Sequence, residues 1–157
     1  MKSLAVFSAV FLLAACQSTP GSTSGMSGKG GANGAAKPGS AADLTENVGD
    51  RVFFALNSSA LSDEAQKTLQ HQAAWLKQYP GVNVTVEGHC DERGTREYNL
   101  ALGERRAAAA KKYLVSEGIA AARISTISYG KERPAVIGDD EAAWSQNRRA
   151  VTVLMNQ

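Results

Sequence analysis

The sequence predicts a two-layer α/β (α+β) sandwich with the element order β-α-β-α-β-β, preceded by a disordered linker. Short runs rich in β-branched and aromatic residues alternate with stretches of helical periodicity, and a last strand follows a loop. The chain has 157 residues, of which 43% are hydrophobic and 20% are charged. These values suit one globular domain with an N-terminal extension.

Residues 1–15 are typical of a bacterial lipoprotein signal peptide. Lys2 gives a positive start, and residues 4–13 (LAVFSAVFLL) form an apolar run too short to span a bilayer as a helix. The following LAAC sequence resembles a bacterial lipobox, which implies that Cys16 is acylated and becomes the first residue after cleavage. An ordinary signal peptide that happens to precede a cysteine is the alternative. Gln17, in place of aspartate, favours the outer membrane in lipoproteins of this kind.

Residues 16–43 comprise Cys16 and a predicted flexible linker. Residues 17–43 contain seven of the fifteen glycines and no aromatic residue. Such a segment cannot bury enough surface to offset its ordering entropy. A flexible coil of this length spans roughly 30 Å on average. We therefore expect the domain, at residues 44–157, to be held to a membrane by a lipid anchor and yet to move away from its surface.

The first half of the domain predicts a strand, a helix and a strand. Residues 51–56 (RVFFAL) form a short apolar strand that residues 57–59 break. Ser62 is a good N-cap for a helix with apolar positions at helical spacing, which ends at residues 79–81 (YPG). Residues 82–87 (VNVTVE) alternate between apolar and polar side chains and therefore predict the second strand.

The second half predicts a long helix and two further strands. A charged loop leads to a helix that begins at Thr95 or Arg96, runs to about Glu117 and stops at Gly118. Residues 123–129 (RISTISY) predict the third strand. A loop with one helical turn near residues 140–145 precedes the last strand, at residues 149–155, which we expect to join the sheet in an antiparallel sense. We expect the helices to pack on the sheet.

Several functional classes are disfavoured by the composition. The formal net charge is +2 and only 6% of residues are aromatic. The chain therefore lacks both the basic charge and the stacking residues that nucleic-acid partners require, and we expect no nucleic acid. We also expect no cofactor, because the sequence contains no glycine-rich phosphate loop.

Ionisable residues concentrate in the stretch EGHCDERGTREYNLALGERRA, which begins at Glu87. Catalysis by Cys90 with His89 as base is disfavoured, because neighbouring residues on a strand point to opposite faces. The run from His89 to Glu92 is consecutive and lacks metal-ligand spacing, so we expect no metal. Paired carboxylates of a glycosidase remain open on the sequence alone. We expect the protein not to be an enzyme.

A cleft for a zwitterionic ligand is the interpretation with the clearer physical basis. Asp91 follows the carboxyl end of a strand, and Arg106 lies on the next helix, on the same stripe as Asn99 and Leu102. Asp91 can complement an ammonium group, and the planar guanidinium of Arg106 can complement a carboxylate. We therefore predict that Asp91 and Arg106 face one pocket, shaped by Asn99 and Leu102.

The segments TVEGHCDERGTREYNLALGERRA, ISYGKERPAV and SQNRRAVTV resemble the OmpA-C-like peptidoglycan-binding domain family. With the lipobox and linker, the chain resembles more narrowly the lipoprotein members that act in the Tol–Pal system. The resemblance implies non-covalent binding of peptidoglycan through the meso-diaminopimelate of the stem peptide. Asp91 matches the aspartate of the family's GHxDxxG motif, and Arg106 matches the arginine of its LxxxRA motif. The implied partner protein is TolB, at the outer membrane, in envelope integrity and cell division.

Two positions depart from the family pattern. Asn57 stands where an aspartate usually ends the first strand, and we expect its amide to contact the ligand by hydrogen bonds. Cys90 stands where alanine or threonine is common. The NRR motif at residues 147–149 is predicted to be mainly structural, with contact to the glycan left open. Two alternatives stay open, a periplasmic wall-modifying enzyme that uses residues 89–92 and an OmpA-like domain of a motor or efflux assembly.

Overall fold

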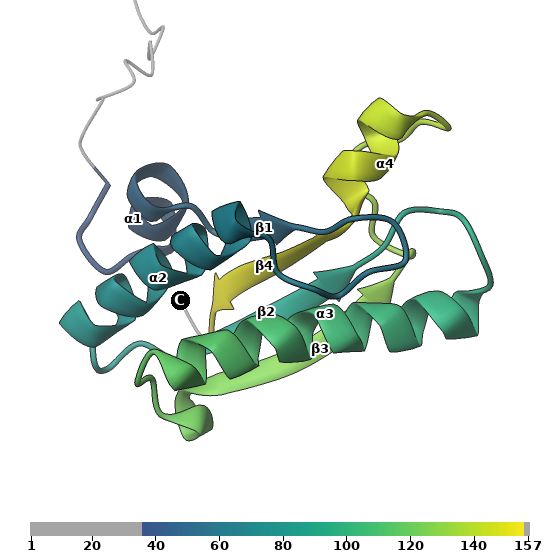
Figure 1. Cartoon of the computed structure of the whole chain (residues 1–157). Coiled ribbons are helices and arrows are strands. Elements are labelled where there is room, and N and C mark those ends of the chain that lie inside the picture. Colours follow the sequence, from purple (N-terminus) through teal and green to yellow (C-terminus); the bar gives the residue numbers. More distant parts are fainter. Residues whose placement is uncertain (1–35, 156–157) are drawn as a thin grey trace, which may run out of the picture. The chain divides into compact units, whose positions relative to one another are not determined.

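The computed structural model describes residues 36–155. The predicted signal peptide, Cys16 and most of the predicted linker lie outside these residues. A four-stranded sheet with the order β1-β4-β2-β3 forms the centre of the domain (Figure 1). None of the helices in the described part of the chain is long and apolar enough to cross a lipid bilayer.

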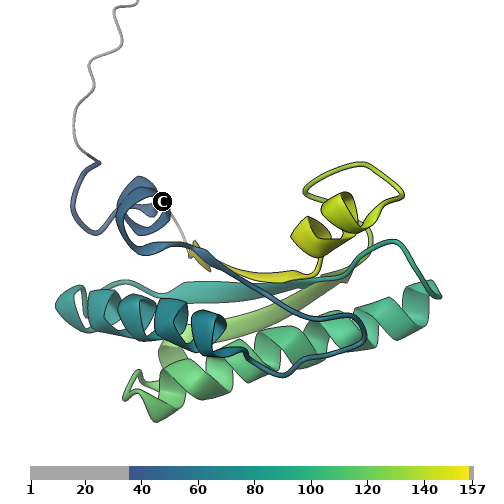
Figure 2. The same cartoon turned by 45° about the horizontal axis from the view of Figure 1, so that its top comes forward.

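The predicted order of strands and helices is confirmed. β4 runs antiparallel to β1 and β2, and β2 runs parallel to β3. Figure 2 shows α2 and α3 on one face of the sheet and α4 on the other. In chain order the elements are α1 (Ala41–Asp43), η1 (Leu44–Val48), β1 (Arg51–Phe53), α2 (Asp63–Gln78), β2 (Val84–His89), α3 (Arg96–Ser116), η2 (Ala121–Arg123), β3 (Ile124–Gly130), α4 (Glu141–Asn147) and β4 (Arg149–Leu154).

Local signals in the sequence set the ends of the helices. The side chains of Ser62, Thr95 and Asp140 each accept a hydrogen bond from the backbone N–H three residues later, and each of these residues is an N-cap. α3 ends just before Gly118, whose φ of 95° suits the left-handed turn that commonly follows a helix. These caps place α3 directly after the charged loop.

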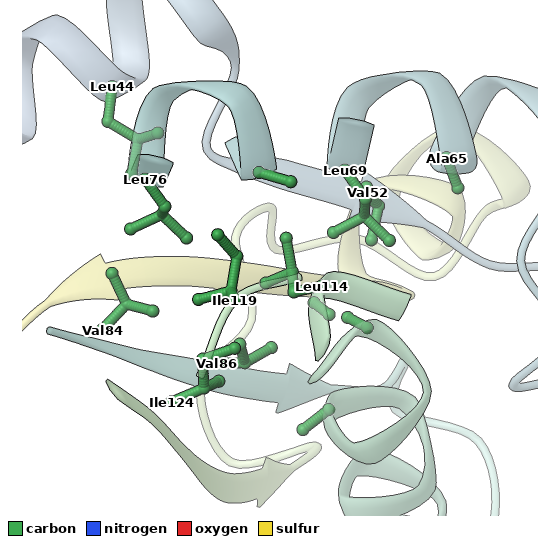
Figure 3. Close-up of a cluster of buried hydrophobic side chains, with 14 of the residues drawn as sticks. Leu44, Val52, Ala65, Leu69, Leu76, Val84, Val86, Leu114, Ile119 and Ile124 are labelled. Carbon is green, nitrogen blue, oxygen red and sulfur yellow. The ribbon is translucent and has the colours of Figure 1, made fainter. Parts of the chain in front are cut away.

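The hydrophobic core lies between the sheet and the helices α2 and α3 (Figure 3). Val84 and Val86 face this core from β2, as expected from the period of two along a strand. Leu69 and Leu76 reach it from α2, and Leu114 reaches it from α3. The core therefore fixes α3 on β2, the strand that leads into the charged loop.

Two glycines allow α3 to approach β2 very closely. A Cβ atom on Gly88 would lie 1.8 Å from the carbonyl oxygen of Gly103, and a Cβ atom on Gly103 would lie 2.3 Å from Ser128 Oγ. No side chain larger than hydrogen fits at Gly88 without a backbone shift. This contact sets the distance between the helix and the strand, and with it the position of the residues that follow β2.

The segment before β1 is helical, contrary to the prediction that the flexible linker extends to Asp43. Asp43 Oδ2 accepts hydrogen bonds from Trp75 Nε1 and from the Gly39 N–H, both at 2.8 Å, and Asp43 Oδ1 accepts one from Asn47 Nδ2, also at 2.8 Å. Leu44 is buried in the core. The end of the predicted linker is therefore wrong, because these tertiary contacts offset the entropy of ordering the segment.

Candidate functional site

Asp91 lies in the loop after β2 and is ion-paired with two arginines, Arg93 in the same loop and Arg148 from a distant part of the chain. Its Oδ1 atom accepts hydrogen bonds from the Arg93 backbone N–H (3.2 Å) and from Arg93 Nε (3.3 Å). Its Oδ2 atom accepts from Arg93 Nη2 (2.6 Å) and from Arg148 Nη1 (3.4 Å). We call Asp91, Arg93, Arg148, Glu141 and Trp144 the Asp91 cluster.

The negative charge of Asp91 is stabilised within this cluster. Burial by itself raises the pKa of the Asp91 carboxyl, but the hydrogen bonds from Arg93, with a smaller contribution from Arg148, outweigh it and hold the pKa below its usual range. Asp91 is therefore ionised at neutral pH. An ionised carboxylate near the surface attracts cationic groups, and it binds them most strongly where hydrogen bonds assist.

Arg148 connects Asp91 to the end of β1. Its Nε atom donates to the Phe54 carbonyl (3.0 Å) and its Nη2 atom donates to Glu141, while its own carbonyl accepts from the Phe54 N–H (2.9 Å). Arg148 belongs to the NRR motif that was predicted to be mainly structural. That prediction fits Asn147, whose side chain bonds the backbone of the preceding loop. Arg148 ties Asp91 to the backbone of Phe54, which is also a structural role.

Arg93 and Trp144 form the outer side of the Asp91 cluster. The guanidinium carbon of Arg93 lies 3.9 Å from the centre of the Trp144 ring, in cation–π geometry. Trp144 Nε1 donates to Glu92 Oε1 at 3.2 Å. The Arg93 side chain is 33% exposed, whereas that of Asp91 is 6% exposed, so Arg93 covers the carboxylate. The residue pattern did not identify Glu141 or Trp144 as site residues, because only the fold brings α4 to the loop. Arg93 was not predicted either, although it lies only two residues after Asp91.

Arg106 was predicted to face a cleft beside Asp91. It is instead fully buried, at 0% exposure. Its Nε, Nη1 and Nη2 atoms donate to the carbonyls of Ser58 (2.9 Å), His89 (2.8 Å) and Ala55 (3.1 Å). The stripe that carries Arg106 is the face of α3 that packs on the sheet. Arg106 therefore ties the loop after β1 to the end of β2, and Asp91 pairs with Arg93 and Arg148 instead.

The other predicted site residues divide between the interior and the surface. Asn99 Nδ2 donates to the carbonyls of Arg93 (2.8 Å) and Thr95 (3.1 Å), and so holds the loop that carries Asp91. Leu102 is one of the buried residues of α3, and Asn57 is exposed in the turn after β1. Asn57 has a φ of 53°, which asparagine tolerates better than most residues. Asn99 and Leu102 thus support the loop from within and do not line an open pocket.

A groove of ≈ 480 Å³ lies between α4 and the loop after β1. Its walls carry aromatic, small apolar and hydroxyl groups, among them Phe53, Phe54, Ala55, Ser58, Ser145 and Gln146. Arg148 holds the carbonyl of Phe54, and Arg106 holds the carbonyls of Ala55 and Ser58. The two buried arginines therefore fix the wall of an open groove that adjoins the Asp91 cluster.

His89 and Cys90 do not form a nucleophile and base. The thiol of Cys90 donates to the Asn99 carbonyl (3.3 Å), and burial raises its pKa, so the reactive thiolate is disfavoured. His89 stacks on Tyr129, and its Nε2 atom lies 3.6 Å from Glu87 Oε2, too far for a hydrogen bond. Between residues 36 and 155, no group of three His, Cys, Asp or Glu residues is placed to hold a metal ion.

Lowering the pH is expected to destabilise the domain through His89. Burial, followed by the charges of Arg149, Arg133 and Arg51, lowers the pKa of His89 from 6.5 to about 4. Between these values the unfolded chain binds a proton that the folded chain does not. The contribution of neutral His89 to the free energy of unfolding is therefore fully present above about pH 6.5. It is lost as the pH falls to about 4, by at most about 3.4 kcal/mol. Urea unfolding at about pH 7 and pH 4.5 measures this loss.

Matched histidine variants isolate this effect. His89→Asn is expected to reduce the loss of stability between the two pH values, whereas His71→Asn, at the other and exposed histidine, is expected to leave it unchanged. An equal pH dependence in wild type and His89→Asn would contradict the assignment.

The sequence matches one family profile and is similar to lipoproteins from several bacteria. The OmpA family profile matches residues 53–148. The peptidoglycan-associated lipoprotein of Agrobacterium fabrum is 61% identical over 132 residues, which cover 84% of this chain and 74% of that protein. The peptidoglycan-associated lipoprotein of Haemophilus influenzae is 46% identical over 154 residues, which cover 96% of this chain and 95% of that protein.

Solved structures show the same fold. The crystal structure of the peptidoglycan-associated lipoprotein from Burkholderia pseudomallei is 43% identical, with a TM-score of 0.66, and the match covers 68% of this chain and 90% of that one. The C-terminal domain of Helicobacter pylori MotB is 22% identical, with a TM-score of 0.64, over 69% of this chain and 85% of that one. At this lower identity the likeness concerns the fold alone.

Proposed function

This chain belongs to the OmpA family, among its peptidoglycan-associated lipoproteins, and from this we propose that it binds peptidoglycan non-covalently and tethers the cell wall to the outer membrane. The observation that carries the proposal is the ionised Asp91, held between Arg93 and Arg148 beside an open groove. Carboxylate and guanidinium groups at one place suit a ligand with both ammonium and carboxylate groups.

The proposed ligand is the stem peptide of peptidoglycan, bound through the ammonium and carboxylate of meso-diaminopimelate. Asp91 receives the ammonium group. Arg93, the more exposed partner of Asp91, turns its guanidinium to the ligand carboxylate, while Arg148 stays in place. Asn57 offers its amide from the turn after β1. Arg106 holds the groove wall from beneath and adds positive charge, while Asn99 and Leu102 support the loop.

The anchor in this proposal is an acylated Cys16 in the outer membrane, with the domain facing the periplasm and residues 17–35 as the remaining linker. Anchoring keeps the domain near the wall and raises its effective concentration there, so modest affinity is sufficient. We propose TolB as the protein partner, within the Tol–Pal system, in envelope integrity and cell division. Binding occurs without cleavage, and turnover of muropeptides by the purified protein would contradict this.

Asp91→Asn is expected to weaken peptidoglycan binding by about ten- to a hundredfold, because the ligand ammonium loses a charge-assisted hydrogen bond of roughly 1.5–3 kcal/mol. The amide has nearly the same shape as the carboxylate. Co-sedimentation with purified sacculi measures the loss, and circular dichroism checks that the variant is folded. The control is Glu64→Gln, which removes an exposed carboxylate from the first turn of α2. Binding by Asp91→Asn at the level of this control would contradict the proposal.

A further inference from the structure

β3 provides the long free edge of the sheet. β1 and β3 lie at the two ends of the strand order, but β1 has three residues and β3 has seven. One side of β3 pairs with β2, and among residues 36–155 no strand pairs with its other side (Figure 1). The β3 sequence, ISTISYG, contains neither proline nor lysine, the residues that commonly protect an edge. Its outer backbone groups can therefore pair with an added strand.

A shallow groove of ≈ 550 Å³ runs beside this edge, between β3 and α3. Leu100 and Ala101 of α3 line it together with Ile127 of β3. Leu100 is 50% exposed and Ile127 is 40% exposed. A strand added to an edge takes its affinity from backbone hydrogen bonds and its specificity from pockets for alternate side chains. Leu100 and Ile127 supply such apolar contacts next to the free edge.

The wall of this groove is preformed. Ser128 Oγ of β3 donates to the Leu100 carbonyl of α3 at 2.6 Å. A Cβ atom on Gly130 would lie 3.0 Å from the Leu100 backbone nitrogen, so the strand and the helix are in close contact at this end as well. A partner segment that enters the groove therefore does not have to order its walls, which reduces the entropic cost of binding.

The charge of the groove indicates the kind of segment that fits. Glu97 and Glu104 line it, and no lysine or arginine does so. Glu104 Oε1 accepts a hydrogen bond from Thr126 Oγ1 of β3 at 2.9 Å, which places this carboxylate at the strand. Complementary charge favours a partner with basic side chains. Two copies of this edge would bring like charges to the same groove, which disfavours pairing between copies.

We propose that the β3 edge binds an extended segment of a partner protein with alternating apolar and basic side chains. The segment adds a fifth strand beside β3. Ser128 bonds to α3, so its neighbour Ile127 lies on the opposite face of the sheet. The basic side chains of the segment lie on the α3 side, beside Leu100, and approach Glu97 and Glu104, whereas its apolar side chains contact Ile127 on the other face. No residue of the Asp91 cluster lines this groove. Strand addition and peptidoglycan binding can therefore be tested separately.

The probe is a fluorescent peptide of roughly eight residues that alternates valine and lysine, the length of strand that β3 can accommodate. We expect saturable binding to the full chain in a fluorescence anisotropy titration. Leu100→Lys and Glu97→Lys are each expected to weaken it at least about tenfold, a loss of roughly 1.4 kcal/mol. Ile137→Lys is the matched control, because Ile137 is 94% exposed and lies outside the groove. Circular dichroism checks the fold of each variant.

Two further peptides test the mode of binding. A valine–glutamate peptide and a valine–lysine peptide with alternate backbone N-methyl groups are each expected to bind at least about tenfold more weakly, because the first reverses the charge and the second cannot pair with the edge. Absence of saturable binding, equal binding of the N-methylated peptide, or wild-type binding by Leu100→Lys would overturn the proposal. Dimerisation of the chain that Leu100→Lys abolishes would assign the edge to a second copy and would also overturn it.

Discussion

Replacing Gly88 by alanine is expected to lower the free energy of unfolding by about 3 kcal/mol or more, the upper range for overpacking a core. The added Cβ would lie 1.8 Å from the carbonyl oxygen of Gly103. That oxygen belongs to the backbone of a helix of 21 residues and cannot rotate away, so α3 or β2 has to shift. Urea unfolding followed by circular dichroism measures the loss.

Two other glycines provide the comparison for Gly88. Gly81→Ala is the control, because nothing lies within 4 Å of a Cβ atom there. It is expected to change stability by less than about 0.5 kcal/mol, as at most surface positions. The loss of stability in Gly103→Ala is expected to lie between the two. Its nearest contact, Ser128 Oγ at 2.3 Å, is a side-chain atom that can rotate, and its nearest backbone contact, the Gly88 carbonyl oxygen, is at 2.9 Å. Equal stabilities of Gly88→Ala and Gly81→Ala would show that α3 does not depend on this contact.

Arg106→Ala is expected to lower the free energy of unfolding by about 3 kcal/mol or more. It is also expected to abolish peptidoglycan binding, because the groove wall that Arg106 holds loses its support. The change leaves the carbonyls of Ser58, His89 and Ala55 without their donor. The bond to His89 is buried, and a buried acceptor left unpaired costs roughly 1–3 kcal/mol, to which the lost packing of the Arg106 side chain adds. Lysine has one nitrogen in place of three, so Arg106→Lys is also expected to be destabilised. Urea unfolding and co-sedimentation with sacculi are measured on the same preparations.

The neighbouring arginine provides a matched control for Arg106. Arg105 is exposed on the same turn of α3, and Arg105→Ala is expected to change stability by less than about 0.5 kcal/mol. A different result would be informative. If Arg106→Ala kept wild-type stability but lost peptidoglycan binding, the structural role assigned to Arg106 would be contradicted. The result would instead support the direct contact with the ligand that the sequence predicted.

The elements of the fold were predictable where their signals are local. Ser62 and Thr95 are N-caps whose bonds reach three residues along the chain, so both helix starts could be identified. The helical segment before β1 could not, because its stability depends on the bond between Asp43 and Trp75, which are 32 residues apart. Single-sequence patterns carry no information on such a pairing.

The candidate site was predictable only in part, for the same reason. The position of Asp91 in the loop after β2 could be predicted, but the partner predicted for it, Arg106, lies on the buried face of α3. A stripe that mixes Asn99, Leu102 and Arg106 does not reveal whether it faces the core or the solvent. Arg148 and Asp91 are 57 residues apart in the sequence. They come together only because β4, which follows Arg148, lies between β1 and β2 in the sheet.

The bond between Asp43 and Trp75 has a mechanical consequence for the tether proposed above. Tension applied to the chain before residue 36 reaches the domain at α1, ahead of the three-residue strand β1. The load passes into α2 through the Trp75 indole and through Leu44 in the core. The weakest edge of the sheet, and the groove wall that follows it, are thereby shielded from the pull.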